Sequence, residues 1–311
     1  MIANPVKNKR KPHHQKLSKG DVIFNIINYT VFLLITLVCL FPFYYLFINT
    51  ISSNELVSMG RIQLIPKEIH FENYVQVFKI SGIFDALLVS VARTVLGTVW
   101  TVGGCAFLGY LVTKQEMWLR KLWYRLIVVT MYFSAGLIPW YLNLRNLGFV
   151  DNFWVYVIPG LVSPYNVILV KTFIEGLPGS LEESATLDGA GYTRVFVSVI
   201  FPLITPILAT LCIFSAVGQW NSFTDTMMLM PGGNYYTLQF LLYKYQNEAS
   251  SLAALVRTTQ DTSAMANLAT RQTSLSVQMT VAMVVTFPIL LVYPFFQRYF
   301  VKGIMIGAVK G

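Results

Sequence analysis

The sequence predicts an all-α membrane protein with six transmembrane helices, on the basis of its composition, its charge-free stretches and the sorting of its basic residues. Of its 311 residues, 55% are hydrophobic and only 12% are charged, whereas a soluble domain carries about 25% charged residues. This composition disfavours a water-soluble enzyme. Six stretches without charge, extended past Arg93 in the second, approach or exceed the roughly 20 residues that cross a hydrocarbon core about 30 Å thick.

The spans follow the gaps between charged residues. No charge occurs over residues 22–54, and the apolar centre of this gap predicts a first span at 26–48. It is too long for a cleaved secretory signal, whose apolar part has about 7 to 15 residues, and is expected to be an anchor. The later gaps predict spans at about 86–113, 124–144, 152–172, 197–221 and 275–297. A further uncharged stretch, 226–243, is interrupted by Pro231 and two glycines and predicts a loop with an interfacial or re-entrant piece.

The basic residues predict that both termini are cytoplasmic. With six spans, 15 Lys and Arg residues fall on the side of the termini and 7 on the other side, and the side richer in Lys and Arg is cytoplasmic. The chain thus divides into a basic tail at 1–25, a transmembrane domain at 26–300 and a C-terminal tail at 301–311. The net charge of +9 is an orientation signal. A nucleic-acid partner is not expected, because the cationic tail adjoins a membrane span and anionic lipid is nearer.

The most informative segment is the cytoplasmic loop at 176–196, between the fourth and fifth spans. Ser180 followed three residues later by Glu183 is a capping box, which predicts the start of a helix. This short helix covers 181–188, Gly189 ends it, and a second helical run leads into the fifth span. The pattern is typical of a surface helix that presents one face to a partner.

Catalytic chemistry is not predicted. Glu183 and Asp188 lie five positions apart, about 140° around a helix, so they cannot converge on one substrate atom as paired hydrolytic carboxylates do. The sequence contains no HExxH, GxSxG or GxxxxGK[ST] pattern, and the last of these is the usual phosphate-binding loop. The three cysteines lie far apart in apolar runs, so neither a disulfide framework nor a metal site is expected.

The loop resembles the EAA loop of bacterial ABC importer permeases. Glu183, Ser184 and Ala185, then Asp188, Gly189 and Ala190, match the family pattern E-A-A-x-x-D-G-A, with Ser184 as a mild departure at the first alanine. Val199 and Phe201 depart equally mildly from the I-x-L-P that follows. The segments ARTVLGT at 92–98, QWNSF at 219–223 and the ending from residue 297 are similar to carbohydrate-uptake permeases of the MalG type, in the LplC/YtcP branch.

The resemblance implies a MetI-like ABC permease fold with a cytoplasmic coupling helix, in a multi-pass protein of the bacterial cell membrane. Six residues would dock on an ATPase: Glu183, Ser184, Ala185, Asp188, Gly189 and Ala190. Gly303, Gly307, Lys310 and Gly311 would form a tail that reaches the same subunit. The implied partners are a second, homologous permease, an ATPase dimer that holds ATP and Mg²⁺, and an extracellular substrate-binding protein that contacts the loop at 225–271. Membrane lipid and a carbohydrate are implied as well, and the family points to an oligosaccharide. No cofactor is expected in this chain.

Polar and aromatic side chains within spans are candidates for the translocation pathway, because burying polar atoms in lipid is costly and aromatic rings suit sugar faces. The candidates are Arg93, Tyr132, Gln219, Trp220 and Asn221. Two accounts of Arg93 stay open: it reaches the outer surface as a snorkelling side chain, or it faces a cavity or pairs with an acid on another helix. The alternative function is a secondary transporter or channel, which would need ionisable groups in the membrane, and Arg93 alone qualifies.

Overall fold

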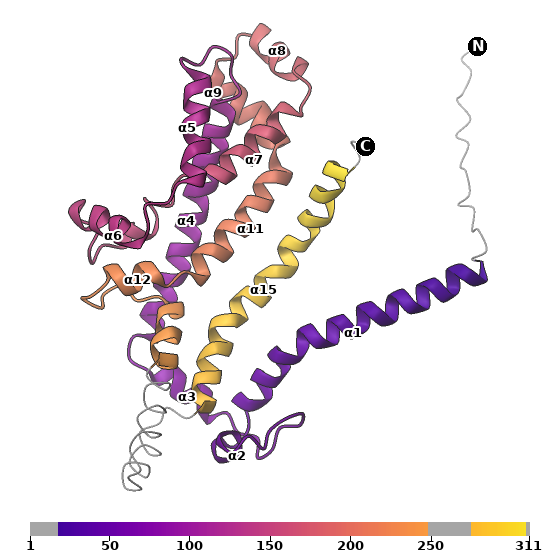
Figure 1. The fold of residues 1–311 in the computed structure, drawn as a ribbon, viewed down its shortest axis with the longest axis vertical. Helices are drawn as coiled ribbons and strands as arrows, with labels where there is room; N and C mark the ends of the chain where they lie inside the picture. The colour runs from indigo at the N-terminus through magenta and orange to yellow at the C-terminus, as the bar shows by residue number, and fades with distance from the viewer. Residues whose placement is uncertain (1–17, 248–274, 309–311) are drawn as a thin grey trace, which may run out of the picture.

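The computed structural model describes residues 18–247 and 275–308, and within these ranges every regular element is a helix. Five helices lie side by side in a bundle: α4 (Ile83–Leu111), α5 (Arg120–Tyr132), α7 (Pro164–Glu175), α11 (Thr205–Asn221) and α15 (Leu275–Ala308) (Figure 1). At one end lie α8 (Ser180–Leu187) and α9 (Tyr192–Val195), and at the other α2 (Asn54–Ser58) and α3 (Glu72–Lys79). On one flank lie α6 (Leu137–Asn146) and α12 (Thr224–Leu229).

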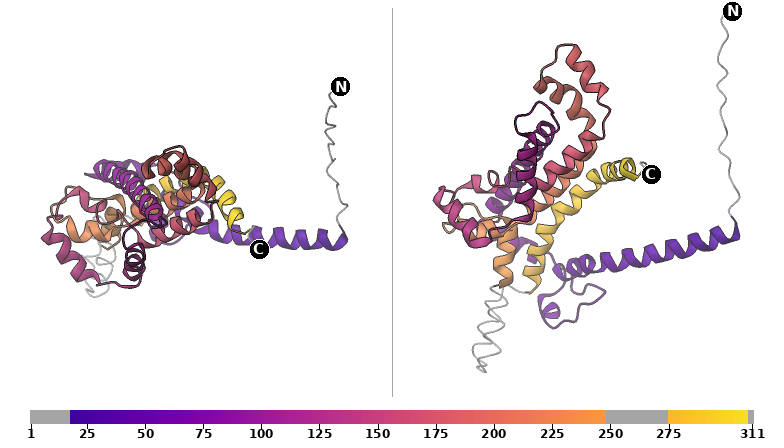
Figure 2. Two further views of the ribbon diagram at one scale, coloured as in Figure 1. Left: turned by 90° about the horizontal axis from the view of Figure 1, so that it is seen from above. Right: turned by 45° about the horizontal axis from the view of Figure 1, so that its top comes forward.

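The first helix, α1 (Lys19–Thr50), leaves the bundle and extends away from it (Figures 1 and 2). The C-terminal end of α1 packs against α15, and Ile48, Asn49 and Thr50 at this end are the buried residues of α1. Only 6% of its most hydrophobic stretch is buried. A soluble monomer rarely exposes so large an apolar surface, so α1 requires lipid or another apolar partner along most of its length.

The spans agree in part with the sequence prediction. Of the described helices, α1 and α4 are long and apolar enough to cross a membrane, and up to four crossings result if each of two bent helix pairs counts as one. The spans predicted at 26–48 and 86–113 fall within α1 and α4, apart from two residues after α4. The helix α15 covers the sixth predicted span. The number six and the cytoplasmic termini stay predictions.

The third and fourth predicted spans are not single straight helices. Over 124–144, α5 and α6 are bent by 120° across residues 133–136, where Gly136 takes a left-handed φ of 88°. Over 152–172, the 3-10 helix η1 (Phe153–Tyr156) is separated from α7, which begins only at Pro164. Proline lacks an N–H donor and is favoured in the first turn of a helix, so Pro164 marks a helix start and not an interior.

The second helical run of the loop at 176–196 also departs from a regular helix. After α9, the chain forms a π-helix, η2 (Phe196–Ile200), and a short α10 (Phe201–Leu203), and it bends by 81° before α11. A π-bulge inserts an extra residue in a helical turn and is frequent at functional sites. Here it joins the α8 region to a helix that crosses the bundle.

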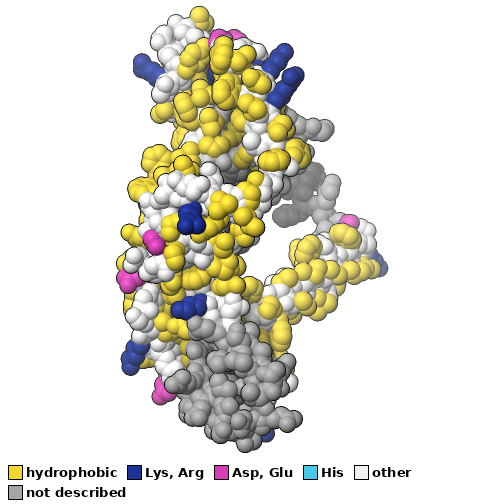
Figure 3. Space-filling model, turned by 60° about the vertical axis from the view of Figure 1, so that its left-hand side comes forward, with side chains coloured by type: hydrophobic (Ala, Val, Ile, Leu, Met, Phe, Trp, Pro, Cys, Tyr) yellow, Lys and Arg dark blue, Asp and Glu magenta, His cyan; other side chains and the backbone are white. Residues whose placement is uncertain are grey.

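The core of the bundle is where α4, α7, η2 and α11 meet. Its buried members include Tyr110, Val170, Phe196, Ile200 and Leu211, and the ring of Phe196 lies 5.1 Å from that of Tyr110. Outside this core, hydrophobic side chains form broad patches on the coloured part of the face drawn in Figure 3, and Lys and Arg side chains stand out near its top and at separate points below. An apolar exterior around an equally apolar core is what a lipid-embedded bundle requires.

Candidate functional site

The first candidate site is α8, which ends in a Schellman motif. Gly189 takes a left-handed φ of 81°, its N–H donates to the Thr186 carbonyl at 3.0 Å, and the Ala190 N–H donates to the Ala185 carbonyl at 3.0 Å. These are the two hydrogen bonds that define the motif. Ala185 and Ala190 both pack against the bundle core, which supplies the apolar contact that accompanies it. The glycine in E-A-A-x-x-D-G-A is therefore required by the backbone.

The predicted extent of this helix is right to within one residue, but its predicted capping box is wrong. Ser180 is the first helical residue, Gly179 occupies the cap position, and no side-chain cap hydrogen bond forms. Two N–H groups of the first turn find backbone partners instead, since that of Leu181 donates to the Pro178 carbonyl at 3.3 Å and that of Glu182 to the Gly179 carbonyl at 3.0 Å. The Pro-Gly turn thus replaces the side-chain cap.

A second attachment joins α8 to the end of α4. The Lys114 ammonium pairs with Glu182 and lies 4.1 Å from the centre of the Tyr110 ring, a cation–π arrangement. The Tyr110 hydroxyl donates to the Tyr192 carbonyl at 3.3 Å. The core-facing side of α8 is therefore fixed to α4 by charge, ring and apolar contacts.

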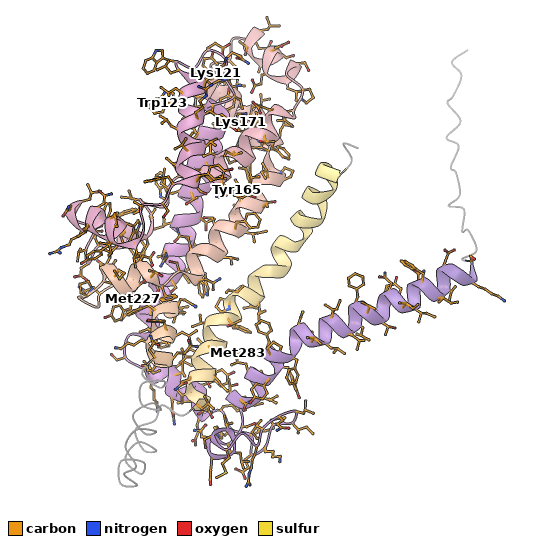
Figure 4. All side chains as sticks on the ribbon, in the orientation of Figure 1. Lys121, Trp123, Tyr165, Lys171, Met227 and Met283 are labelled. Atoms are coloured by element: carbon orange, nitrogen blue, oxygen red, sulfur yellow. The ribbon has the colours of Figure 1, made fainter. Side chains whose placement is uncertain are left out.

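Other side chains of α8 are exposed, and Glu183 and Leu187 line a cavity together with Lys114 and Tyr110. Glu183 and Asp188 are exposed, and Leu187 is 89% exposed. Basic side chains lie in the same part of the molecule: Figure 4 places Lys121 on α5 and Lys171 on α7, toward the end that carries α8. Lys171 pairs with Glu175 at 2.6 Å. Sequence reasoning missed Leu187, although an exposed leucine between Glu183 and Asp188 is a signal for a docking surface.

The second candidate site surrounds Arg93. Its guanidinium makes a bidentate pair with Asp225, at 3.0 and 2.5 Å, and donates to the Ser222 carbonyl at 3.1 Å and to Gln219 Oε1 at 3.0 Å. Arg93 is 3% exposed and Asp225 14%. Pairing with an acid on another helix is therefore confirmed, and snorkelling to the outer surface is wrong.

Neighbouring groups hold this pair in place. The Arg93 guanidinium lies 4.5 Å from the centre of the Tyr156 ring, and the Tyr156 hydroxyl donates to the Tyr235 carbonyl at 2.6 Å. Gln219 Nε2 donates to the Tyr156 carbonyl at 3.2 Å. Gln219 can approach α4 because residue 97 is glycine, where an added Cβ would lie 2.6 Å from Nε2. The cluster joins α4, η1, α11 and α12.

A cavity of about 400 Å³ opens beside the Arg93 cluster, between α4, α7 and α11. Its lining is rich in polar side chains: Arg93, Ser163, Asn166, Ser215, Gln219 and Ser222. Sites of this kind combine a concave space with a few well-placed polar groups. The structure thus brings two of the five pathway candidates, Arg93 and Gln219, to one cavity.

The other three pathway candidates lie elsewhere. Tyr132 is 80% exposed at the end of α5. Trp220 faces away from the polar cavity, donates from Nε1 to the Val285 carbonyl at 3.0 Å and lines a separate apolar pocket with residues of α4 and α15. Asn221 is exposed. Asp225 and Tyr156 are the functional residues that sequence reasoning missed, since nothing in a single sequence links Arg93 to a residue 132 positions later.

The C-terminal tail candidates are described only in part. Gly303 and Gly307 belong to α15, while Lys310 and Gly311 lie outside the described residues. The helix α15 therefore runs through the start of the segment at 301–311 that was expected to be a tail. A contact with another subunit stays a prediction.

Comparison with known proteins places these features in a family. No family model matches the chain. It is 32% identical to the polygalacturonan/rhamnogalacturonan transport system permease protein YtcP of Bacillus subtilis (strain 168), over 93% of this chain and 99% of the relative. It is 31% identical to Protein LplC of the same organism, over 96% of this chain and 99% of the relative.

A solved structure agrees with these relatives. The fold matches a bacterial ABC transporter involved in the import of the acidic polysaccharide alginate, with a TM-score of 0.78 and 30% identity over 92% of this chain and 99% of that chain. The match spans nearly the whole length of both chains. The chain belongs to the family of carbohydrate ABC importer permeases, which are non-catalytic membrane subunits.

Proposed function

We propose that this chain forms half of the translocation pathway of a binding-protein-dependent importer for an oligosaccharide, and that α8 docks on a separate ATPase subunit. The observation that carries the proposal is that α8 is both attached and exposed. It is fixed to the bundle through Ala185, Ala190 and the Lys114–Glu182 pair, while Leu187, beside the same cavity as Lys114, is 89% exposed. Because α8 is attached to α4 in this way, a displacement of α8 by a bound subunit would also move α4.

The other half of the pathway is a second, related permease. One support is α1, whose apolar surface extends away from the bundle and is available to another subunit (Figure 2). The other is the polar cavity between α4, α7 and α11, which is open at the surface of this chain and is not enclosed by it. ATP binding would draw the ATPase subunits together and switch the cavity between inward-facing and outward-facing states. Such a switch requires that ATP bind the two states with different affinity.

The substrate class rests on the relatives. YtcP is named for polygalacturonan and rhamnogalacturonan, and the solved relative imports alginate, so an oligosaccharide that contains uronic acids is the first substrate to test. A substrate-binding protein on the outer side would deliver it, through contacts with the loop at 225–271. An ion-coupled transporter is not favoured, because Arg93, the candidate coupling charge, is already paired with Asp225.

The test is Leu187→Asp in the importer purified with its partner subunits. We expect the ATPase to dissociate and ATP-dependent uptake of galacturonate oligosaccharides to fall at least tenfold, because a charge would replace the apolar centre of the docking surface. Leu147→Asp is the matched control: Leu147 is 64% exposed but follows α6, far from α8 (Figure 1). Equal uptake and equal ATPase recovery in both variants would contradict docking through α8.

A further inference from the structure

We propose that this chain carries its own saccharide subsite, in which Asn166, Ser163 and Ser215 bind the hydroxyl groups of one sugar residue as the substrate passes. The inference rests on the proposed function and adds a binding site to it. The three residues line the polar cavity, and they come from three places: the residue before α7, α7 itself and α11.

Asn166 carries the inference. It is 7% exposed, it lines the cavity, and its carboxamide forms no hydrogen bond with any described residue. Unlike the hydroxyl groups of Thr94 and Thr98, which are enclosed without a hydrogen-bond partner, the carboxamide of Asn166 is open to the cavity. A carboxamide offers one acceptor oxygen and two N–H donors, so Asn166 is suited to a ligand group that both donates and accepts, as a sugar hydroxyl does.

The two serines extend this surface. Ser163 occupies the N-cap position of α7, but its hydroxyl makes no capping hydrogen bond. Its backbone N–H and carbonyl are engaged with Cys105 Sγ, at 3.3 and 3.6 Å, which fixes the residue while leaving the side chain available. Beside Ser215, the ring of Phe214 also lines the cavity and is 49% exposed. An aromatic ring next to hydroxyl and amide groups is a suitable surface for the apolar face of a sugar.

The charges around the cavity indicate which part of the sugar is bound. Arg93 is the charged residue among those that line the cavity, and Asp225 balances it at 3.0 and 2.5 Å. Its remaining contacts, to Gln219 and to the Ser222 carbonyl, occupy further N–H groups. A carboxylate of an acidic saccharide therefore gains no net attraction here. The subsite binds hydroxyl groups, and the acidic or neutral character of the substrate is selected elsewhere.

The first experiment measures uptake by the complete importer in proteoliposomes, with radiolabelled galacturonate trisaccharide as the probe. We expect Asn166→Leu to raise the KM of uptake about 3- to 10-fold, the effect of one or two lost hydrogen bonds, and Asn221→Leu on the exposed side of α11 to leave it unchanged. The same KM for Asn166→Leu and the wild type would overturn the subsite. Failure of the wild-type importer to take up any saccharide would overturn the proposed function together with it.

The second experiment is independent of any folding defect in Asn166→Leu. Ser215→Cys, in a chain in which Cys39 and Cys212 are replaced by alanine and the fully buried Cys105 is kept because it holds Ser163, is labelled with a small water-soluble thiol reagent during turnover. We expect the trisaccharide to slow labelling at least threefold, and labelling of Asn221→Cys in the same background to be unaffected. Labelling of Ser215→Cys at one rate with and without saccharide would overturn the subsite. No labelling at all would also overturn it, since it would mean that the partner permease fills the cavity.

Discussion

The buried pair of Arg93 and Asp225 gives a quantitative prediction for Asp225→Asn. This change keeps the size of the side chain and removes its charge, so the guanidinium, which is 3% exposed, is left with an uncompensated charge. Two unit charges about 4 Å apart attract by about 4 kcal/mol at an effective dielectric constant of about 20. Breaking one partner of a buried pair costs about 3–5 kcal/mol in other proteins. We expect a loss of this size in the free energy of unfolding.

The double variant Arg93→Met with Asp225→Leu distinguishes the net contribution of the ion pair from the cost of leaving one buried charge unpaired. Replacing both charges by apolar side chains removes the desolvation penalty as well as the attraction, so such replacements are often nearly neutral. We therefore expect the double variant to be more stable than Asp225→Asn by about 2 kcal/mol or more. Glu175→Gln is the control, because Glu175 is 44% exposed in its pair with Lys171 and an exposed pair is worth about 0.3–0.5 kcal/mol.

The assay is reversible unfolding of the purified chain by SDS in lipid–detergent micelles, followed by circular dichroism. The reasoning fails if Asp225→Asn loses less than about 1 kcal/mol, the range of an exposed pair. It fails as well if the losses of Arg93→Met and Asp225→Leu, each made alone, simply add in the double variant, because residues in contact should show an interaction energy.

Three further predictions concern the ends of the bundle. Gly189→Ala should cost about 1–2 kcal/mol locally, because φ at this position is 81°, and should weaken recovery of the ATPase. Gly191→Ala, where φ is −72°, should not. Lys114→Met should lower uptake more than ATP hydrolysis, because α8 would lose its pair with Glu182; equal losses in both assays would contradict a coupling role. Trp220→Phe should lower thermal stability by about 1 kcal/mol, through loss of the hydrogen bond from Nε1 to α15, and an unchanged melting temperature would argue against that bond.

The sequence was informative wherever one local rule decided the structure. The charge-free run at 22–54 predicts a long apolar helix, and α1 is one. The glycine at 189 predicts a helix end, and α8 does end there, with Gly189 in a left-handed backbone conformation. Gaps between charged residues do not predict whether a span is straight, because a bend in the backbone leaves the spacing of charges unchanged. Gly136 and Pro164 were visible signals that the third and fourth spans are interrupted.

The Arg93 cluster was less predictable, for a physical reason. An isolated charge in an apolar run is costly, which predicts that Arg93 needs a partner but does not say which one. Asp225 lies among the outer-loop acids in sequence and becomes the partner only because α12 folds back beside α4. The amide of Gln219 was selected for its polarity, yet its position depends on the missing side chain at Gly97. Contacts of this kind depend on tertiary packing and not on local pattern.

Both candidate sites depend on α4, and this determines how they can be coupled. The helix contributes Tyr110 to the α8 attachment and Arg93 to the outer cluster, and at about 1.5 Å per residue these positions lie about 26 Å apart along one continuous helix. A displacement of α8 that is passed to α4 must therefore either shift Arg93 relative to Asp225 or carry α12 with it. Because four hydrogen bonds hold Arg93, moving α12 together with α4 costs less than shifting Arg93 relative to Asp225. We therefore expect α12 to move with α4 as one body, so that a change at α8 reaches the Arg93 cluster without breaking the pair with Asp225.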